Sequence, residues 1–228
     1  MTAEMASRGA EVLALELDKG LEPVLRSVLA PWEDRVSLVF GDAMKADISA
    51  LLRQRFGGRP VSVVANLPYY ITTDVVLRLL ECGARLDKIV VMVQMEAAQR
   101  MMAAPGEKNY CALAALVQFY GEARKLMELE PRLFTPPPHV VSWLMEIKRF
   151  EERPVQVQSE EMMKKVISAC FLMRRKKLLN NLCAAFSLGR SEALEAIRAA
   201  GLEEGVRGEA LSLEEMARLA GQLMKTRC

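Results

Sequence analysis

The segment Asn66-Leu67-Pro68-Tyr69-Tyr70 combines an amide, a proline-stiffened turn and two aromatic rings. The Asn66 side chain offers a carbonyl acceptor, and Pro68 leaves the preceding Leu67 carbonyl free to point outward. Two neighbouring acceptors suit an exocyclic amino group, which donates two hydrogens. Tyr69 supplies a flat face on which a base can stack, worth about 1–3 kcal/mol per base. These residues predict a site for an amino-bearing base, and a surface turn that caps the core is the alternative interpretation.

Three predicted strands end in a polar residue, at Glu16, Asp42 and Asn66. In open α/β sheets ligands bind outside the carboxyl ends of the strands, and an acid after the second strand binds a ribose diol in Rossmann-like folds. Gly41, which precedes Asp42, lets the backbone approach a ligand. Taken alone, Glu16 is better explained as a solvated strand-end charge. Three polar strand ends along one sheet edge, however, predict a site.

The elements that would position these residues follow from the hydrophobic periodicity. We expect a doubly wound α/β sheet over residues 1–151, closed by an antiparallel hairpin, in which the run 61–65 is a buried parallel strand. The loop Phe134–Val140 must be extended, because three prolines exclude both helix and central strand. The predicted strands are 11–16, 36–40, 61–65, 89–94, 124–129 and 141–147, and the predicted helices are 2–8, 19–29, 48–56, one from about 72, 96–103 and 112–120.

After Pro154 the pattern changes to short helices, and we predict a separate helical domain over residues 152–228. Its helices are expected at about 159–172, 176–185, 191–200 and 212–224. Between Met162 and Ser191 the chain has seven basic residues and no acidic one, namely Lys164, Lys165, Arg174, Arg175, Lys176, Lys177 and Arg190. A solvated helix face usually mixes both signs, so this stretch is better explained by binding to a polyanion. A merely solubilising face is the alternative.

Composition bounds the remaining possibilities. With 228 residues, 51% of them hydrophobic, the chain can bury a substantial core, and its net charge of only +2 means that nucleic-acid affinity must come from local patches. The five scattered cysteines lack C-x-x-C spacing, which favours a reducing cytoplasm over a disulfide framework or a zinc site. The single histidine, His139, excludes a multi-histidine metal site and disfavours a histidine-based triad. We see no signal peptide and no apolar run long enough to span a bilayer.

Together these residues resemble the KsgA-type family of small-subunit (16S) rRNA adenine N6-dimethyltransferases. The motifs that carry the resemblance span nearly the whole chain: Glu16 with Asp18, Gly41-Asp42-Ala43, Asn66-Leu67-Pro68-Tyr69-Tyr70-Ile71-Thr72, Val91-Met92-Val93-Gln94 with Glu96 and Arg100, Phe134 with Pro136, Pro138, Val140 and Ser142, Phe171 with Arg174-Arg175-Lys176-Lys177-Leu178, Asn180-Asn181-Leu182, and Gly201, Arg207, Glu209 and Leu211-Ser212. The macrolide-resistance methyltransferases of large-subunit rRNA share the Asn-x-Pro-Tyr turn but usually lack the basic helical signature. They are the second-ranked interpretation.

The resemblance implies a Rossmann-like class I methyltransferase sheet with a small all-α rRNA-binding domain. It implies S-adenosylmethionine as the cofactor and two adjacent adenines near the 3′ end of small-subunit rRNA, in a 30S-type subunit precursor, as the target. We expect a cytoplasmic monomer that needs no metal and no membrane. On the cofactor side, Glu16 would hold the ribose hydroxyls, Asp42 with Ala43 the adenine, and Asn66 would also contact the cofactor.

On the RNA side, the resemblance implies that Asn66 and the Leu67 carbonyl orient the target amine on the turn that Pro68 stiffens. Tyr69 would stack on the flipped adenine and Phe134 would pack on its other face. The basic residues implied to bind rRNA are Arg174, Arg175, Lys176 and Lys177.

The chain departs from the family pattern at Met95 and His139, where the family usually has lysine, and at its front. Family members carry a further segment before Thr2, with the first strand and its G-x-G-x-G loop. We therefore expect an N-terminally truncated sheet and weak or absent cofactor binding by the sequence as it stands. A non-catalytic rRNA-binding assembly protein is the alternative, but the intact Asn66–Tyr70 turn favours a methyltransferase. A third interpretation, a nucleotide-dependent oxidoreductase, is not supported by the basic helices.

Overall fold

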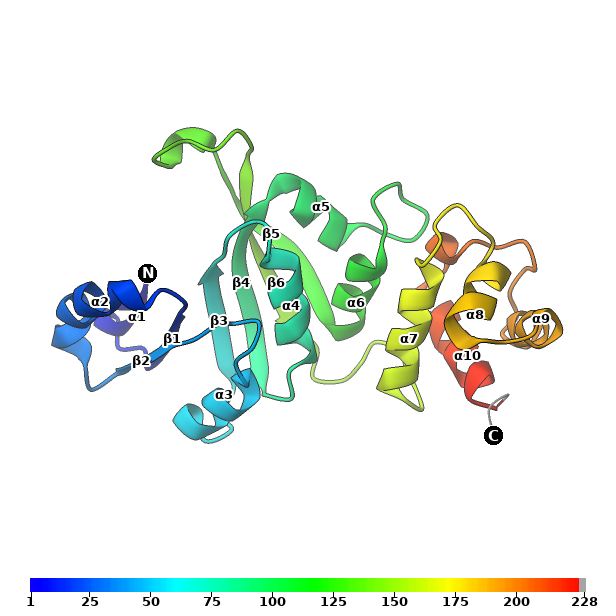
Figure 1. Ribbon diagram of the computed structural model, residues 1–228, viewed down its shortest axis with the longest axis horizontal. Helices are drawn as coiled ribbons and strands as arrows, with labels where there is room; N and C mark the ends of the chain where they lie inside the picture. The colour runs from blue at the N-terminus through cyan, green and yellow to red at the C-terminus, as the bar shows by residue number, and fades with distance from the viewer. Residues whose placement is uncertain (226–228) are drawn as a thin grey trace. The chain divides into compact units, whose positions relative to one another are not determined.

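The computed structural model describes residues 1–225 (Figure 1). The chain divides into two compact units. The first unit is Met1–Ser62 with Asp74–Asp87, and the second is Val63–Thr73 with the chain from Lys88 onward. The domain boundary predicted at 151/152 lies inside the second unit, because strands and C-terminal helices both belong to it.

The order of elements is the alternation of strands and helices that the sequence predicts. The strands are β1 (Val12–Glu16), β2 (Val36–Phe40), β3 (Val61–Asn66), β4 (Leu86–Gln94), β5 (Gly121–Leu129) and β6 (Ser142–Arg149). The helices are α1 (Thr2–Ser7), η1 (Lys19–Leu21), α2 (Glu22–Leu29), η2 (Ala30–Trp32), α3 (Ile48–Phe56), α4 (Thr72–Glu81), α5 (Met95–Met102), α6 (Ala112–Tyr120), η3 (Pro131–Leu133), α7 (Glu160–Cys170), α8 (Leu178–Phe186), α9 (Arg190–Ala199), η4 (Gly208–Ala210) and α10 (Leu213–Lys225).

In the first unit, β1 and β2 form a parallel pair in register from Val12 opposite Val36 to Glu16 opposite Phe40. Local signals set the bounds of α3. The Asp47 carboxylate caps its start by accepting the Ala50 N–H at 2.9 Å, and Gly57 ends it with a left-handed φ of 60°. Because β1 and β2 are parallel, their carboxyl ends lie at the same edge of the pair, and this edge carries Glu16 and Asp42.

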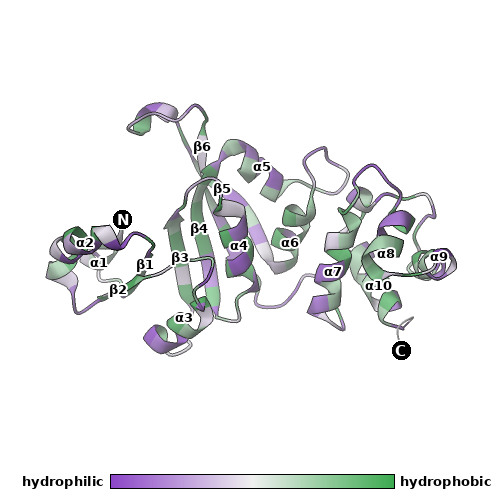
Figure 2. Ribbon diagram, in the orientation of Figure 1, coloured by the Kyte–Doolittle hydropathy of each residue, from purple (hydrophilic) through white to green (hydrophobic). Residues whose placement is uncertain are grey.

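The second unit contains a four-stranded sheet in the order β3-β4-β6-β5, with β6 antiparallel to both of its neighbours. Figure 2 shows hydrophobic residues along β3 and β4, and Ile89, Val91 and Val93 of β4 have no exposed surface. The prediction that residues 61–65 form a buried strand is wrong. β3 is the end strand of its sheet, its burial alternates between half-buried and exposed, and Val64 is 36% exposed.

Segments far apart in the second unit meet at the C-terminal end of α7. The Cys170 carbonyl accepts a hydrogen bond from the Asn181 side chain at 3.2 Å, and a Cβ atom at Gly208 would collide with the same oxygen. Phe171 packs edge-on against Tyr110 with ring centroids 5.3 Å apart. Burial raises the pKa of the Cys170 thiol to about 12, so this cysteine is an inert part of the core.

The described chain has neither a membrane-spanning helix nor a metal-binding cluster. Over residues 1–225, no helix is long and apolar enough to cross a membrane. The same residues contain no group of three or more His, Cys, Asp or Glu side chains arranged to hold a metal ion.

Candidate active site

Two half-buried carboxylates, Glu16 and Asp42, lie at the carboxyl ends of β1 and β2. The Gly41 N–H donates to the Glu16 carbonyl at 2.8 Å, which fixes the two chain segments beside each other. One Glu16 carboxylate oxygen accepts the Asp18 N–H at 2.9 Å, and one Asp42 oxygen accepts the Met44 N–H at 2.8 Å. Each carboxylate is thus oriented by its own turn and has a second oxygen that can accept a ligand hydroxyl or amino group. The second oxygen of Asp42 also lies 3.8 Å from the Lys45 ammonium nitrogen, an exposed ion pair that a ligand would have to share or displace.

A cavity of about 490 Å³ adjoins this edge. Apolar side chains supply much of its wall, and Asp42 supplies a carboxylate. The wall includes Leu15, Phe40, Gly41, Asp42, Ala46 and Leu51. Lys45, Asp47 and Gln54 add a cation, a second carboxylate and an amide to the wall. Apolar surface beside such acceptors suits a flat heterocycle that carries an amino group. Glu16 and Ala43 are not among the lining residues, although both adjoin the segment that forms the cavity.

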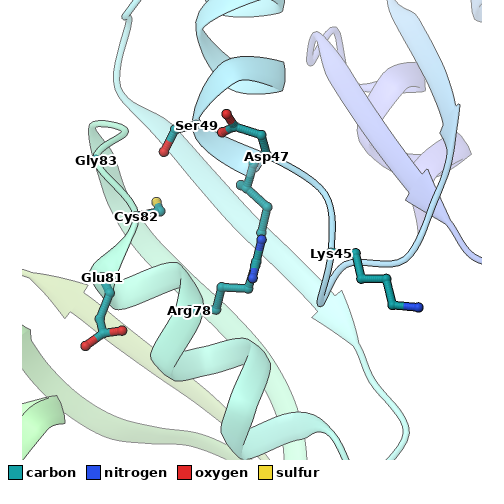
Figure 3. Close-up of a pocket in the computed structure, with 8 residues that line it drawn as sticks. Lys45, Asp47, Ser49, Arg78, Glu81, Cys82 and Gly83 are labelled. Atoms are coloured by element: carbon teal, nitrogen blue, oxygen red, sulfur yellow. The ribbon is translucent and has the colours of Figure 1, made fainter.

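A second cavity, of about 390 Å³, lies between α3 and α4 (Figure 3). Arg78 extends from α4 toward Asp47 at the start of α3, and its Nη2 donates to the Ala46 carbonyl at 2.6 Å. The lining includes both cations and carboxylates, so it has no strong preference for either sign of ligand. Arg78 instead holds the loop that follows Asp42, a role that no local sequence pattern reveals.

The turn after β3 is closed by hydrogen bonds to one carbonyl. The Pro68 carbonyl accepts the Ile71 N–H at 3.1 Å and the Thr72 hydroxyl at 3.0 Å, and Thr72 is only 2% exposed. The Asn66 side chain is exposed, and none of the described residues forms a hydrogen bond with its amide. The turn is rigid while its amide remains available to a ligand.

The two tyrosines of this turn differ sharply. The Tyr70 ring is 83% exposed, whereas Tyr69 is half-buried and its hydroxyl lies 2.8 Å from the Ser142 hydroxyl. Phe134 is also half-buried, and it begins the loop that runs through a cis Thr135–Pro136 bond to Ser142. Tyr69, Phe134 and the Asn66 turn belong to the second unit, whereas Glu16, Asp42 and Ala43 belong to the first.

The basic residues between α7 and α8 also divide into two kinds. Arg174 forms an ion pair with Glu209 at 2.8 Å and donates to the Lys108 carbonyl, so it is committed to the protein. Arg175, Lys176 and Lys177 are exposed, and none of them forms an ion pair with the described part of the chain. We call these three residues the basic turn.

Solved structures with the same fold define a class of protein. The structure matches that of a dimethyladenosine transferase from Plasmodium falciparum with a TM-score of 0.77 and 19% identity, covering 99% of this chain and 86% of that one. It matches the 23S rRNA methyltransferase ErmE with a TM-score of 0.68 and 23% identity, covering 98% of this chain and 86% of that one. The fold is the methyltransferase fold, which confirms the predicted α/β class.

Sequence comparison then defines the family. The chain is 40% identical over 222 residues to the ribosomal RNA small subunit methyltransferase A of Lachnoclostridium phytofermentans, covering 96% of this chain and 77% of that protein. The model of the ribosomal RNA adenine dimethylase family matches residues 1–225. The chain belongs to the ribosomal RNA adenine dimethylase family, and the resemblance inferred from its motifs is confirmed.

Proposed function

We propose that this protein, in a form that carries the glycine-loop segment of its family, dimethylates the N6 amines of two adjacent adenines near the 3′ end of small-subunit rRNA, with S-adenosylmethionine as the methyl donor. The observation that carries the proposal is the closed turn after β3, which presents the uncommitted Asn66 amide beside an anchored Tyr69. A turn that only capped the core would have no need of an exposed amide next to a stacking ring. The identity to a small-subunit methyltransferase supports this target over large-subunit rRNA.

The acidic strand ends suit the adenosine half of the donor. Glu16 would accept hydrogen bonds from the ribose hydroxyls, and Asp42, next to Ala43, would accept one from the adenine amino group. Both carboxylates are already oriented by backbone N–H groups, so little ordering is required on binding. When bound, S-adenosylmethionine supplies a sulfonium methyl group that is already activated for transfer, so the protein needs no strong base.

The turn after β3 would orient the target. In the first transfer, the Asn66 side-chain carbonyl and the Leu67 carbonyl, on the turn stiffened by Pro68, accept the two hydrogens of the adenine amine. In the second transfer the methylated amine has one hydrogen left, which one of these carbonyls accepts, and each transfer releases one amine proton to water. These bonds rotate the nitrogen lone pair out of conjugation with the ring and toward the methyl donor, and such positioning is a large source of rate. The adenine must first leave its stack. Tyr69 on one face and Phe134 on the other would hold it.

The basic turn of Arg175, Lys176 and Lys177 would bind phosphates of the rRNA, with a smaller contribution from Arg174 because its guanidinium is paired with Glu209, a carboxylate that it shares with Arg207. We place the protein in the cytoplasm, acting as a monomer on small-subunit precursors. The scattered cysteines and the proposed ribosomal substrate support this placement.

The test is incubation of a form that carries the family's glycine-loop segment with methyl-labelled S-adenosylmethionine and separately purified small and large ribosomal subunits that lack the modification. We expect label in the small-subunit rRNA and none when Asn66→Ala replaces the wild-type chain. Label in the large subunit would favour a macrolide-resistance type of activity. Tight binding to small subunits without any label would favour a non-catalytic assembly protein.

A further inference from the structure

We propose that Ser142 is a positioning residue for methyl transfer, because its hydroxyl holds the Tyr69 ring in the orientation that stacks on the target base. The inference rests on the proposed function of Tyr69 and adds to it a residue outside the turn. Its direct observation is the 2.8 Å hydrogen bond between the Tyr69 and Ser142 hydroxyls.

Ser142 is a rigid anchor. It has no exposed surface and is the first residue of β6, where it pairs with Gln94 of β4 on one side and Leu129 of β5 on the other. Just before it, the Val141 carbonyl accepts the Met95 N–H at 3.0 Å. A hydroxyl fixed in this way by two neighbouring strands can restrict a partner that is itself free to move.

Ser142 restricts the side chain of Tyr69 and not the backbone of the turn. The backbone of the turn is closed separately, by the bonds from Ile71 and Thr72 to the Pro68 carbonyl. Those bonds do not restrict rotation of the Tyr69 side chain about its own torsion angles. Tyr70 in the same turn has no such anchor among the described residues, and it is 83% exposed.

The position of Ser142 also connects the two aromatic groups of the proposed base site. Tyr69 reaches Ser142 through its hydroxyl, and the loop that begins at Phe134 ends at Ser142. The start of β6 therefore restricts the movement of Tyr69, which is proposed for one face of the adenine. It also restricts the loop that carries Phe134, which is proposed for the other face. A base held from both sides needs both supports to be fixed before it arrives.

This role requires a tyrosine at position 69 for its hydroxyl as well as for its ring. Phenylalanine would offer an equal stacking face but would lose the anchor. Tyr69→Phe and Ser142→Ala should therefore produce the same defect, since each removes one partner of the same bond.

The experiment is a double-mutant cycle of Tyr69→Phe, Ser142→Ala and the combined variant, measured as single-turnover methyl transfer to small subunits at saturating RNA and cofactor. A neutral hydrogen bond corresponds to a change of about 3- to 10-fold, so each single variant should slow transfer by that factor. The combined variant should be no slower than either one. Affinities for RNA and S-adenosylmethionine should stay within about twofold of wild type.

Tyr69→Phe should not disturb folding, because it removes only one oxygen from a half-buried ring. It therefore tests the hydrogen bond even if Ser142→Ala is poorly folded. Ser168→Ala, which removes an exposed serine hydroxyl from α7, is the control and should transfer at the wild-type rate. Independent slowing in which the two factors multiply would overturn the inference, and so would a wild-type rate for Ser142→Ala. A parallel loss of rate and of both affinities would show a general structural defect and would also overturn it.

Failure of the proposed function gives a different pattern. If Tyr69→Ala, which removes the stacking ring itself, transfers methyl groups normally, Tyr69 has no role in transfer and the inference falls with that assignment. If Tyr69→Ala is slow while Ser142→Ala is normal, the role of Tyr69 stands and only the inference fails.

Discussion

The side-chain amide of Asn66 is the group on which the proposed chemistry depends. Replacement by alanine removes one of the two acceptors for the amine and leaves the turn intact, because the turn is closed at the Pro68 carbonyl. We expect Asn66→Ala to lower the single-turnover rate by about 100-fold, since misorientation at a reacting centre has costs of that size. Affinity for rRNA, measured by filter binding, should be unchanged.

Asn109→Ala is the matched control, because Asn109 is an exposed asparagine in the loop after α5. It should leave both rate and affinity at wild-type values. An Asn66→Ala chain that loses rate and rRNA affinity in equal measure, or that turns over normally, would contradict the assignment of Asn66.

Glu16 is predicted to act on binding and not on the transfer step. Its carboxylate is oriented by the Asp18 N–H, so Glu16→Gln keeps the shape of the group but loses the charge that strengthens hydrogen bonds to hydroxyls. We expect S-adenosylmethionine to bind about 10-fold more weakly, with a near-normal rate at saturation. Calorimetric titration beside a single-turnover assay distinguishes the two. A full-strength titration with a reduced saturated rate would reverse the assignment.

Among the structural elements, the basic turn between α7 and α8 is predicted to set the electrostatic part of rRNA binding. Changing Arg175, Lys176 and Lys177 to glutamine should weaken binding and lower the log–log salt slope by about 2–3, as each lost phosphate contact removes about 0.7–0.9. Binding measured over a series of salt concentrations gives this slope directly.

A control with the same loss of charge is glutamine at Arg8, Lys19 and Arg53, which are exposed residues of the first unit. It should leave the slope unchanged. Arg174→Gln should also have a small effect on the slope, because Arg174 is paired with Glu209. If the triple variant of the basic turn keeps the wild-type slope, its charges are only a solvated surface.

The contact of η4 with the end of α7 determines how the C-terminal helices pack. Because a Cβ at Gly208 would overlap the Cys170 carbonyl, Gly208→Ala should reduce the free energy of unfolding by about 3 kcal/mol. Gly205→Ala is the control, because a Cβ there meets no atom within 4 Å, and its effect should stay within about 0.5 kcal/mol. Urea denaturation measures both, and equal stabilities for the two variants would contradict this packing.

For the molecule as a whole, sequence reasoning was most successful where the structural cause is local. The bounds of α3 and α6 agree with their predicted ranges, and Asp47 and Gly57 delimit α3 by capping. The burial of β3 was mispredicted because an apolar strand does not reveal how many neighbours it has. Successive side chains of β3 point to opposite faces of the sheet, and the face that carries Ser62, Val64 and Asn66 is exposed.

The candidate site shows the same division. Asn66, Tyr69, Glu16 and Asp42 are predicted from their place after strands, which is a local pattern. The ion pair of Arg174 joins residues 35 apart in the chain, and the Tyr69–Ser142 bond joins residues 73 apart. Such contacts depend on tertiary packing, so the sequence could not reveal that Arg174 is engaged or that Tyr69 is anchored.

The central claim is that this protein, in a form that carries the glycine-loop segment of its family, places two methyl groups on the N6 nitrogen of each target adenine through the turn at Asn66. Nuclease digestion of small-subunit rRNA after reaction, followed by mass spectrometry of the nucleosides, tests it most directly. We predict N6,N6-dimethyladenosine at two adjacent positions near the 3′ end with the wild-type chain, and little or none with Asn66→Ala in the same reaction time. Unmodified adenine with the wild-type chain, or equal amounts of product from the two chains, would contradict the claim.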